Sequence, residues 1–362
     1  MKIAQIAPLM ESIPPRWYGG TERIVSYLTE ELVELGHEVT LFASGDSATS
    51  ARLQACVPTA LRLDDSVSDV IPHHLLLLDR VWRSASRFDI LHFHIDYLHF
   101  PLFRPMSDRV LTTLHGRQDL ADLKPVYREF AEMKLVSISD NQRKPLPGAN
   151  FVATVPHGLP LDLLRPTFAP RGGYLAFLGR ITPEKGPDRA IEIARAAGMP
   201  LKIAAKVDAV DADYHREHIE PLLAGSDVEF IGEIGDDRKS EFLGNAAALL
   251  FPIDWPEPFG LVMIEAMACG TPVIAFNCGS VPEIIADGVT GYVVGSVDEA
   301  LAKLPQALAL DRKRIRAEFE RRFSARRMAL DYIALYRSIL GDSDASAHRL
   351  PAAQAPAVAP AG

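Results

Sequence analysis

The feature that most constrains the fold is a regular alternation between short apolar segments and amphipathic ones. Residues 2–7 predict a buried strand, and residues 20–35 predict a helix whose apolar side chains recur every three or four positions. That helix stops at Gly36, and another strand is predicted over residues 39–43. A strand, a helix and a second strand in this order form a βαβ unit, which requires a parallel sheet.

The alternation runs along the chain in two series, which a proline-rich segment at residues 160–170 separates. The first series continues with a predicted helix over residues 75–86 and strands over 90–95, 110–114 and 135–139. The second series predicts strands over 174–178, 201–207, 228–231, 247–251 and 272–275, with helices over 187–197 and 214–223. A chain of 362 residues also exceeds what one hydrophobic core usually organises, so we expect two α/β domains.

We predict a Rossmann-like domain over residues 1–165 and a second over residues 171–320, both doubly wound and facing one another. Residues 321–340 are expected to form a helix that packs back on the first domain. Residues 341–362 are rich in Ala, Pro and Ser and predict a disordered tail. Ligands of such sheets bind beyond the carboxyl ends of the strands, so we expect the site in the cleft between the domains.

Composition narrows the partners and the compartment. The formal net charge of −9 argues against broad nucleic-acid binding, which needs a concentrated basic surface. The three cysteines are too few and too scattered for a disulfide framework or a CxxC metal site, so we expect reduced thiols. Neither a signal-peptide pattern nor an apolar run of membrane length occurs in the sequence, and the expected location is the cytoplasm.

Two cations lie in the segment FLGRITPEKGP, which leaves a predicted strand and enters a helix at Pro187, a favoured first helical residue. This segment brings Arg180 and Lys185 to the carboxyl edge of the second sheet. Cations at such an edge could stabilise a diphosphate leaving group, because negative charge grows on a diphosphate as its bond to a sugar breaks. Taken alone, two solvated loop cations are the simpler interpretation.

The segment EPFGLVMIEAMACG favours a functional role for these two cations instead. Glu257 follows a strand, and Gly260, whose missing side chain lets a ligand approach the backbone, precedes a predicted helix. The free N–H groups of Phe259 to Leu261 and the helix dipole form an anion site. Glu265 lies in the first turns, where a carboxylate can accept both hydroxyls of a ribose. A loop acid and a favourable charge at a helix start would explain the glutamates singly, but not their occurrence with two cations on one sheet edge.

With these motifs the chain resembles family 4 of the glycosyltransferases, which are retaining enzymes of the GT-B fold. Two glutamates separated by seven residues in EPFGLVMIEAMACGTPVIA carry the resemblance, and FLGRITPEKG and the segment from Gly279 to Gly291 support it. The resemblance covers nearly the whole chain to about residue 340. Pro258 departs from it mildly, since the family often has a small polar residue there.

The resemblance implies a role for each matching residue. Arg180 and Lys185 would bind the donor diphosphate, Glu265 the ribose and Glu257 the sugar hydroxyls. The implied donor-binding set is Gly19, Gly20, Arg180, Lys185, Glu257, Pro258, Phe259, Gly260, Leu261 and Glu265, and the implied catalytic set is His115, Glu257, Arg180 and Lys185. We expect a nucleotide-diphosphate sugar as co-substrate, with no further cofactor and no metal.

The first half of the chain supplies fewer signals. Gly19 and Gly20 precede a helix, where glycines can bring backbone donors close to phosphate oxygens, although a plain loop-to-helix turn is more common. In the family this loop reaches the donor phosphates across the cleft. The family also implies that His115, at the end of the strand 110–114, contacts the donor sugar near the reacting carbon. A GxGxxG motif is absent from the sequence after the first strand, which disfavours a dinucleotide-dependent dehydrogenase.

For the acceptor side we expect His94, Asp96 and Tyr97, which end or follow the strand 90–95. His92 and His94 alternate on one face of that strand, and with His115 they form a weak zinc candidate. A core His92 and a cleft-lining His94 beside Asp96 are favoured instead.

Two further features have simpler explanations than a functional one. Asp211 and Asp213 imitate a metal-binding DxD pair, but an aspartate cap on the helix 214–223 is favoured. Three arginines at positions 80, 83 and 87 share one helix face and could make weak peripheral contact with an anionic membrane, whereas a solvated face is favoured.

The sequence therefore predicts a retaining hexosyltransferase that moves a hexose or a related sugar from a nucleotide-diphosphate sugar to an acceptor hydroxyl. UDP is the favoured nucleotide, ahead of GDP and ADP. Front-side attack is the implied mechanism, in which the protein positions the substrates and stabilises diphosphate charge. A GT-B epimerase or phosphorylase and a non-catalytic nucleotide-sugar-binding protein are the alternatives. The acceptor, whether saccharide, lipid-linked or small molecule, and the oligomeric state stay undetermined.

Overall fold

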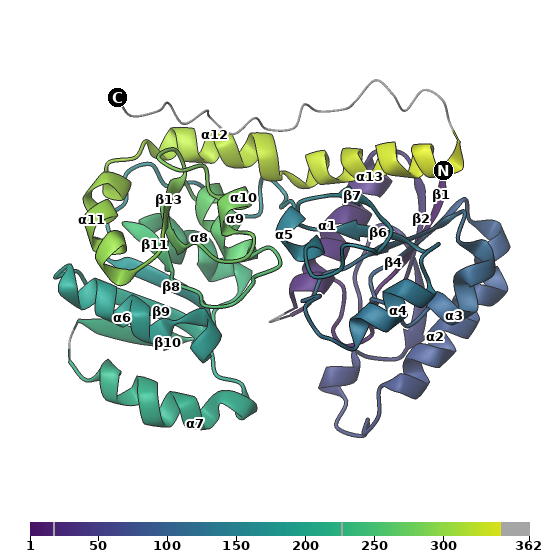
Figure 1. Ribbon diagram of the computed structural model, residues 1–362, viewed down its shortest axis with the longest axis horizontal. Coiled ribbons are helices and arrows are strands. Elements are labelled where there is room, and N and C mark those ends of the chain that lie inside the picture. Colours follow the sequence, from purple (N-terminus) through teal and green to yellow (C-terminus); the bar gives the residue numbers. More distant parts are fainter. Residues whose placement is uncertain (17–18, 226, 342–362) are drawn as a thin grey trace.

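In a computed structural model, which describes residues 1–16, 19–225 and 227–341, the chain forms two parallel sheets flanked by helices (Figure 1). The first sheet has the order β3-β2-β1-β4-β5-β6-β7, and the second has the order β10-β9-β8-β11-β12-β13. This confirms the predicted α/β class and the two Rossmann-like units.

The N-terminal sheet surrounds the central strand pair of β1 and β4, whose apolar side chains are buried on both faces. Its strands are β1 (Lys2–Ile6), β2 (Glu38–Ser44), β3 (Arg52–Val57), β4 (Ile90–Phe93), β5 (Val110–Thr113), β6 (Lys134–Ser137) and β7 (Phe151–Thr154). Its helices are α1 (Gly20–Glu34), α2 (Ile71–Ser84), α3 (Phe100–Phe103), α4 (Leu123–Glu129) and α5 (Asp140–Arg143).

The C-terminal sheet is likewise parallel throughout. Its strands are β8 (Leu175–Arg180), β9 (Leu201–Lys206), β10 (Val228–Gly232), β11 (Ala248–Phe251), β12 (Val273–Phe276) and β13 (Gly291–Val294). The helices that follow these strands or close the chain are α6 (Pro187–Ala196), α7 (Ala212–Tyr214), α8 (Asp236–Asn245), α9 (Leu261–Ala268), α10 (Val281–Ile284), α11 (Val297–Leu308), α12 (Arg312–Phe323) and α13 (Ala325–Leu340).

Three strands had no sequence prediction: β3, β7 and β13. All three are edge strands, and their side chains are partly exposed, so they lack the continuous apolar run of a buried parallel strand. The predicted helix 214–223 also differs, because the segment His215–Ile219 is a π-helix and Glu220–Leu223 is a 3₁₀ helix. Pro221 lacks the N–H that a continuous α-helix needs at this point.

The C-terminal helices cross from one domain to the other. Figure 1 shows α12 along the C-terminal domain and α13, which continues it, along the N-terminal domain. Arg326 of α13 forms an ion pair with Glu34 of α1 at 3.2 Å, and the backbone N–H of Leu159 donates to Phe323 O at 2.8 Å. The predicted disordered tail lies outside the described residues from position 342 onward, so it stays a prediction.

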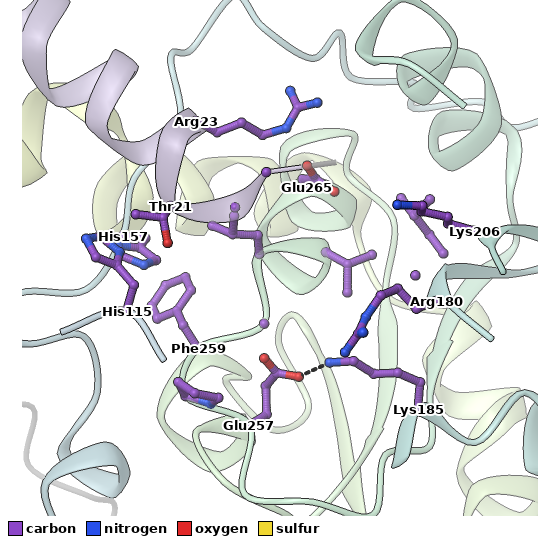
Figure 2. Close-up of a pocket in the computed structure, with 18 of the residues that line it drawn as sticks. Thr21, Arg23, His115, His157, Arg180, Lys185, Lys206, Glu257, Phe259 and Glu265 are labelled. Carbon is purple, nitrogen blue, oxygen red and sulfur yellow. Dashed lines mark hydrogen bonds and ion pairs between the residues drawn. The ribbon is translucent and has the colours of Figure 1, made fainter. Parts of the chain in front are cut away.

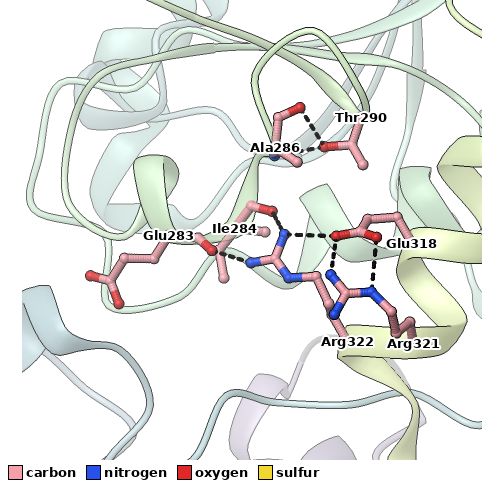
Figure 3. A network of polar contacts seen from close by, with 7 residues as sticks. All are labelled: Glu283, Ile284, Ala286, Thr290, Glu318, Arg321 and Arg322. Carbon is pink, nitrogen blue, oxygen red and sulfur yellow. Dashed lines mark hydrogen bonds and ion pairs between the residues drawn. The ribbon is translucent and has the colours of Figure 1, made fainter. Parts of the chain in front are cut away.

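A polar network anchors α12 to the short helix α10, which contacts the N-terminal domain (Figure 3). Arg322 of α12 donates to the backbone carbonyls of Glu283 and Ile284, and Glu318 accepts from Arg321 at 2.6 Å. The Glu283 carboxylate in turn accepts the backbone N–H groups of Asp140 and Asn141, each at 2.7 Å, at the start of α5. This carboxylate therefore ties the two domains together beside the cleft.

Within the described ranges, no helix is both long enough and apolar enough to cross a membrane.

Candidate functional site

A cavity of about 560 Å³ lies between the two domains, at the carboxyl ends of both sheets. Figure 2 shows its walls, with the helix α1 and two histidines on one side and the strands β8 and β9 on the other. Both domains contribute charged side chains to this one space. Of the lining residues the argument uses Gly19, Gly20, Glu22, Arg23, Arg62, His115, His157, Arg180, Lys185, Lys206, Lys239, Glu257, Phe259, Gly260, Leu261 and Glu265.

Two cations of the C-terminal wall end neighbouring strands. Arg180 is the last residue of β8 and Lys206 the last of β9, and the register pairs them directly. Asp208 accepts from Lys206 Nζ at 2.9 Å and from Arg180 Nη1 at 3.4 Å. Its hydrogen bond to Lys206 is the largest cause that lowers the pKa of the Asp208 carboxyl. The carboxylate thus holds a guanidinium and an ammonium group at the cavity edge.

Lys185 reaches the cavity from the turn that comes after β8. Its ammonium group forms an ion pair with Glu257, and Trp255 Nε1 donates to the same carboxylate oxygen at 2.9 Å (Figure 2). The ammonium also lies 4.7 Å from the centre of the Trp255 ring, within the range of a cation–π contact. Glu257 is 9% exposed, so this pair is largely shielded from water.

The backbone around Glu257 has a shape that only glycines allow. Gly279 has a φ of 61°, and a Cβ there would lie 2.3 Å from Glu257 N. Gly260 caps α9 with a φ of 80°, so the helix begins at Leu261 directly behind the carboxylate. The first N–H groups of a helix have no partner within it, so this helix end is suited to an anion.

A chain of charges links Glu265 to the opposite domain. Lys239 of α8 donates to Glu265 at 2.7 Å and to Asp236 at 3.1 Å, and Asp236 forms an ion pair with Arg23 of α1. Burial disfavours the charged ammonium of Lys239, but the attraction of Glu265 and Asp236 outweighs it and raises the pKa of Lys239. This row of alternating charges crosses the cleft from α9 to α1.

The N-terminal wall begins at the glycine pair. Gly19 caps α1, and a Cβ on Gly20 would lie 3.7 Å from Leu261 of the C-terminal domain, so the glycine loop faces α9 directly. Glu22, in the first turn of α1, is 7% exposed, and burial raises the pKa of its carboxyl. The structure therefore places Gly19 and Gly20 in one cavity with the predicted residues of the second domain.

His115 forms the middle of this wall. Its Nε2 lies 2.9 Å from His94 Nδ1, and burial lowers the pKa of His115 to about 3. The ring of His157 stacks on it with centres 5.3 Å apart, and Phe259 of the C-terminal domain packs on His157 at 4.8 Å. His157 thus bridges the two predicted site residues His115 and Phe259 (Figure 2).

The three residues predicted for the acceptor side lie elsewhere. His94 is buried behind His115 and does not line the cavity, contrary to the prediction that it lines the cleft. Asp96 has a left-handed φ of 50°, and burial raises the pKa of its carboxyl to about 6. Neither Asp96 nor Tyr97 is among the residues that line the cavity.

His92 occupies the core, as the sequence favoured. It is fully buried, and it lies 2.7 Å from Tyr336 Oη and 2.8 Å from Thr113 Oγ1. Across the parts of the chain that are described, no group of three or more His, Cys, Asp or Glu side chains is placed to hold a metal ion.

The favoured interpretation of the Asp211 and Asp213 pair is wrong in its detail. Asp211 stands at the cap position of the short helix α7, but its side chain makes no capping hydrogen bond. Asp213 instead forms an ion pair with Arg216 at 2.7 Å. The α-helical part is only the three residues of α7, and the chain continues with π and then 3₁₀ hydrogen bonding.

The lining residues that the sequence analysis missed include Arg23, His157, Lys206 and Lys239. Lys206 ends a predicted strand, so the rule that found Arg180 applies to it equally. His157 comes after β7, whose half-exposed sequence had hidden the strand. Arg23 and Lys239 lie within helices, and nothing local in the sequence marks them as facing a ligand.

Comparison with family models assigns both halves of the chain. The model described as "Glycosyl transferases group 1" matches residues 166–325, and the model described as "Glycosyltransferase Family 4" matches residues 18–141. The two matches together include most residues of the two walls, and His157 lies between them in the sequence.

Individual relatives agree with this assignment. A D-inositol 3-phosphate glycosyltransferase of Mycobacterium leprae is 32% identical over 224 residues, which cover 55% of this chain and 47% of that protein. The chain thus spans about half the length of such curated relatives. A protein of the same name from Acidothermus cellulolyticus is 26% identical over 92% of this chain and 88% of its own length.

A solved glycosyltransferase structure has the same fold as this chain. AviGT4, a glycosyltransferase involved in avilamycin A biosynthesis, is 26% identical, with a TM-score of 0.73 over 94% of this chain and 98% of that chain. The family matches, the two facing parallel sheets and the cavity between them lead to one assignment. The chain belongs to the group 1 glycosyltransferases of family 4 and has their GT-B fold.

Proposed function

We propose that the protein transfers a sugar from a nucleotide-diphosphate donor to an acceptor hydroxyl with retention of configuration. The observation that carries the proposal is the convergence, in one interdomain cavity, of Arg180, Lys185, Glu257 and Glu265 with the start of α9. These groups match the chemistry of a diphosphate, a ribose and a sugar. UDP is the proposed nucleotide, because it is the most frequent one in the family.

The donor would lie across the C-terminal wall. Arg180 and Lys185 would neutralise the diphosphate with help from Lys206, which shares Asp208 with Arg180. Glu265 would accept the ribose hydroxyls, and the N–H groups at the start of α9 would meet the phosphates or the sugar. In this arrangement Lys185 exchanges part of its pairing with Glu257 for the diphosphate.

Retention is proposed to proceed by front-side attack. Glu257 already accepts from Lys185 and Trp255, which suits a carboxylate that orients sugar hydroxyls rather than one that attacks carbon. The bond from the anomeric carbon to the phosphate oxygen breaks, and the acceptor oxygen bonds to the same face. The acceptor's proton passes to the departing phosphate oxygen, whose charge the two cations stabilise.

Side-chain cations alone are proposed to neutralise the diphosphate, without a metal ion. Six cations line the cavity among the described residues, namely Arg23, Arg62, Arg180, Lys185, Lys206 and Lys239. We expect turnover to survive excess EDTA with a change smaller than about twofold. A loss of activity that Mg²⁺ or Mn²⁺ restores would contradict this part of the proposal.

The acceptor is proposed to enter at the N-terminal wall, beside Arg62 and Glu22. Arg62 already forms an ion pair with the buried Glu11 at 3.0 Å, and Glu22 lies close enough to influence it electrostatically. This wall therefore suits a neutral hydroxyl group better than the phosphorylated inositol for which the curated relatives are named. The three cysteines are unpaired, which fits the proposed cytoplasmic location.

Thermal unfolding with a panel of ligands tests the proposal. UDP, GDP, ADP and their glucose conjugates are added one at a time, because a ligand that binds the folded state raises the melting temperature by mass action. We expect UDP-glucose and UDP to give the largest rise. Release of UDP that increases with an acceptor then separates transfer from epimerisation, phosphorolysis and silent binding. No shift with any nucleotide would refute the donor assignment.

A further inference from the structure

A chain of hydrogen bonds runs beneath the N-terminal wall and ends at His115. Gln5 on β1 and His94, directly after β4, are both buried. Gln5 Oε1 lies 2.7 Å from His94 Nε2, and His94 Nδ1 lies 2.9 Å from His115 Nε2. The chain therefore connects the centre of the N-terminal sheet with the wall of the cavity.

Both imidazoles in this chain are neutral near pH 7. Burial lowers the pKa of His94 well below its ordinary value and that of His115 to about 3. A neutral imidazole carries a proton on one nitrogen and a lone pair on the other. Each ring in the chain must therefore donate at one end and accept at the other, so the whole chain has a direction.

The direction follows from the amide of Gln5. Its Oε1 can only accept, so His94 Nε2 carries the proton and His94 Nδ1 accepts. His115 must then donate from Nε2, and its Nδ1 holds a lone pair. His115 Nδ1 is buried and has no hydrogen-bond partner within the described part of the protein. Because His115 lines the cavity, Nδ1 is the ring nitrogen that is left for a ligand.

The helix α13 fixes the orientation of the amide. Gln5 Nε2 donates to Tyr336 Oη at 3.1 Å and lies 3.4 Å from His92 Nδ1, which is itself 2.7 Å from the same tyrosine oxygen. With the amide reversed, those two hydrogens would face His94 Nε2 as the one nearby acceptor in the described residues. That reversal would give up the donation to Tyr336 Oη, so α13 favours the orientation in which Oε1 faces His94.

We propose that Gln5 and His94 are positioning residues that hold His115 in the tautomer protonated at Nε2, and that this tautomer selects a ligand hydroxyl as the hydrogen-bond donor to Nδ1. The hydroxyl reaches Nδ1 once the wall of the cavity adjusts around the ligand. The ligand part rests on the proposed function, whereas the tautomer is a property of the protein alone.

The tautomer is tested by long-range ¹H–¹⁵N imidazole spectra of the full chain at pH 7.5, with His115 assigned by its loss in His115→Gln. We expect a protonated Nε2 and an unprotonated Nδ1. A protonated Nδ1 would overturn the proposal. Gln5→Met keeps the side-chain length but removes the acceptor, and we expect a mixture of both tautomers in this variant. A single unchanged tautomer there would overturn the role of Gln5.

A milder pair of variants covers the case in which Gln5→Met does not fold. Tyr336→Phe removes an acceptor of the amide, and we expect it to add the minor tautomer at His115. Tyr332→Phe is the matched control, because its hydroxyl contacts Thr113 at 2.8 Å and not Gln5. Equal spectra for these two variants would contradict the role of α13.

The ligand part is tested with UDP-glucose and its analogues that lack one sugar hydroxyl each. We expect one analogue to bind about tenfold more weakly to the native protein, and this penalty to shrink in Gln5→Met. Equal penalties in both proteins would overturn the hydroxyl contact. If UDP-glucose does not bind at all, the proposed donor fails, while the tautomer measured without ligand stands or falls separately.

Discussion

The two walls of the cavity are built from different kinds of polar contact. The C-terminal wall consists of ion pairs, in which Lys185 holds Glu257 and Lys239 holds Glu265. The middle of the N-terminal wall is built from neutral imidazoles, because His157 stacks on His115 and His94 lies 2.9 Å behind it. One wall carries exchangeable charges, and the other carries hydrogen bonds with a fixed direction.

The difference fits the two tasks of a transferase. A donor diphosphate brings its own negative charge, so it can replace a carboxylate as the partner of a cation at moderate cost. A sugar or an acceptor near the reacting carbon offers only hydroxyl groups, which a neutral imidazole recognises by direction. The ion pairs should therefore control leaving-group departure, and the histidines should control geometry.

The largest effect is expected from removing a cation of the C-terminal wall, which is called the charged wall below. Lys185→Ala and Arg180→Ala should each reduce kcat by about 10²–10³-fold, because a preorganised cation acts on the charge that develops in the transition state. Steady-state kinetics with the donor identified by thermal shift measures the loss. The melting temperature should change little in Arg180→Ala, whereas Lys185→Ala also leaves the buried Glu257 without its cation and should melt at a lower temperature.

Lys202→Ala is the matched control for that pair. Lys202 lies on β9 but at the opposite end from the cavity, and it pairs with Glu229 at 2.9 Å. Its kcat should stay within about twofold of the native value, since the residue is remote from the charge that develops. Near-normal kinetics in Lys185→Ala and Arg180→Ala would remove the charged wall from the mechanism.

These residues also show how far the sequence can lead. Arg180 and Glu257 were predictable because parallel strands bring the residues after their carboxyl ends to one edge, and because the motif around Glu257 is specific to a family. Arg23 and Lys239 were not predictable. They lie within helices of different domains, and only the relative placement of those domains brings them to one cavity.

The histidines of the N-terminal wall, called the histidine wall below, show a second limit of prediction from sequence. Strand alternation correctly placed His92 and His94 on one face of a strand, but it cannot say which layer of a packed wall a side chain occupies. His94 lies one layer behind His115, so it touches the cavity only through that residue. The edge strands were missed for a related reason, because their exposed side chains interrupt the apolar pattern.

The histidine wall should make stability depend on pH. Burial lowers the pKa of six described histidines, at positions 37, 92, 94, 99, 115 and 157. In the unfolded chain these rings take up protons as the pH falls through about 6.5, but in the folded protein they stay neutral to lower pH. The folded state is therefore favoured above that pH and loses stability as the pH falls below it.

We expect a loss of about 1.4 kcal/mol per pH unit for each histidine that gains a proton on unfolding. Asp96, whose pKa burial raises to about 6, and the glutamates at positions 22, 31 and 283, whose pKa values burial also raises, act in the opposite sense above their ordinary pKa values. Urea unfolding from pH 7.5 to 5.5 measures the slope. A free energy of unfolding that stays flat over this range would contradict the neutral wall.

A smaller effect is expected at Glu265, the proposed ribose ligand, where loss of stability and loss of donor binding can be measured separately. Glu265→Gln leaves the buried Lys239 with Asp236 as its one remaining anionic partner among the described residues, and should lower the free energy of unfolding by about 2 kcal/mol. The double variant Glu265→Gln with Lys239→Met should recover part of that loss but not the donor affinity, since the ribose ligand is still missing.

The control for this variant is Glu229→Gln. Glu229 also pairs with a lysine, Lys202, but its side chain is 59% exposed, and exposed pairs contribute less than about 1 kcal/mol. Chemical unfolding of the three variants provides the comparison. Equal losses of unfolding free energy in Glu265→Gln and Glu229→Gln would mean that the buried pair stabilises the fold no more than the exposed pair.

The smallest expected effect lies where the two walls meet. Asp236→Asn keeps the shape of the residue but removes the charge that joins Arg23 on α1 to Lys239 on α8. The pair is partly shielded, so we expect kcat/KM to fall by about two- to fivefold, mainly through KM. Raising the salt from 50 to about 500 mM should reduce this difference, because screening weakens the native pair but not the variant. The same ratio at both salt concentrations would mean that Asp236 acts through packing, and that the charged wall ends at Lys239 rather than crossing to α1.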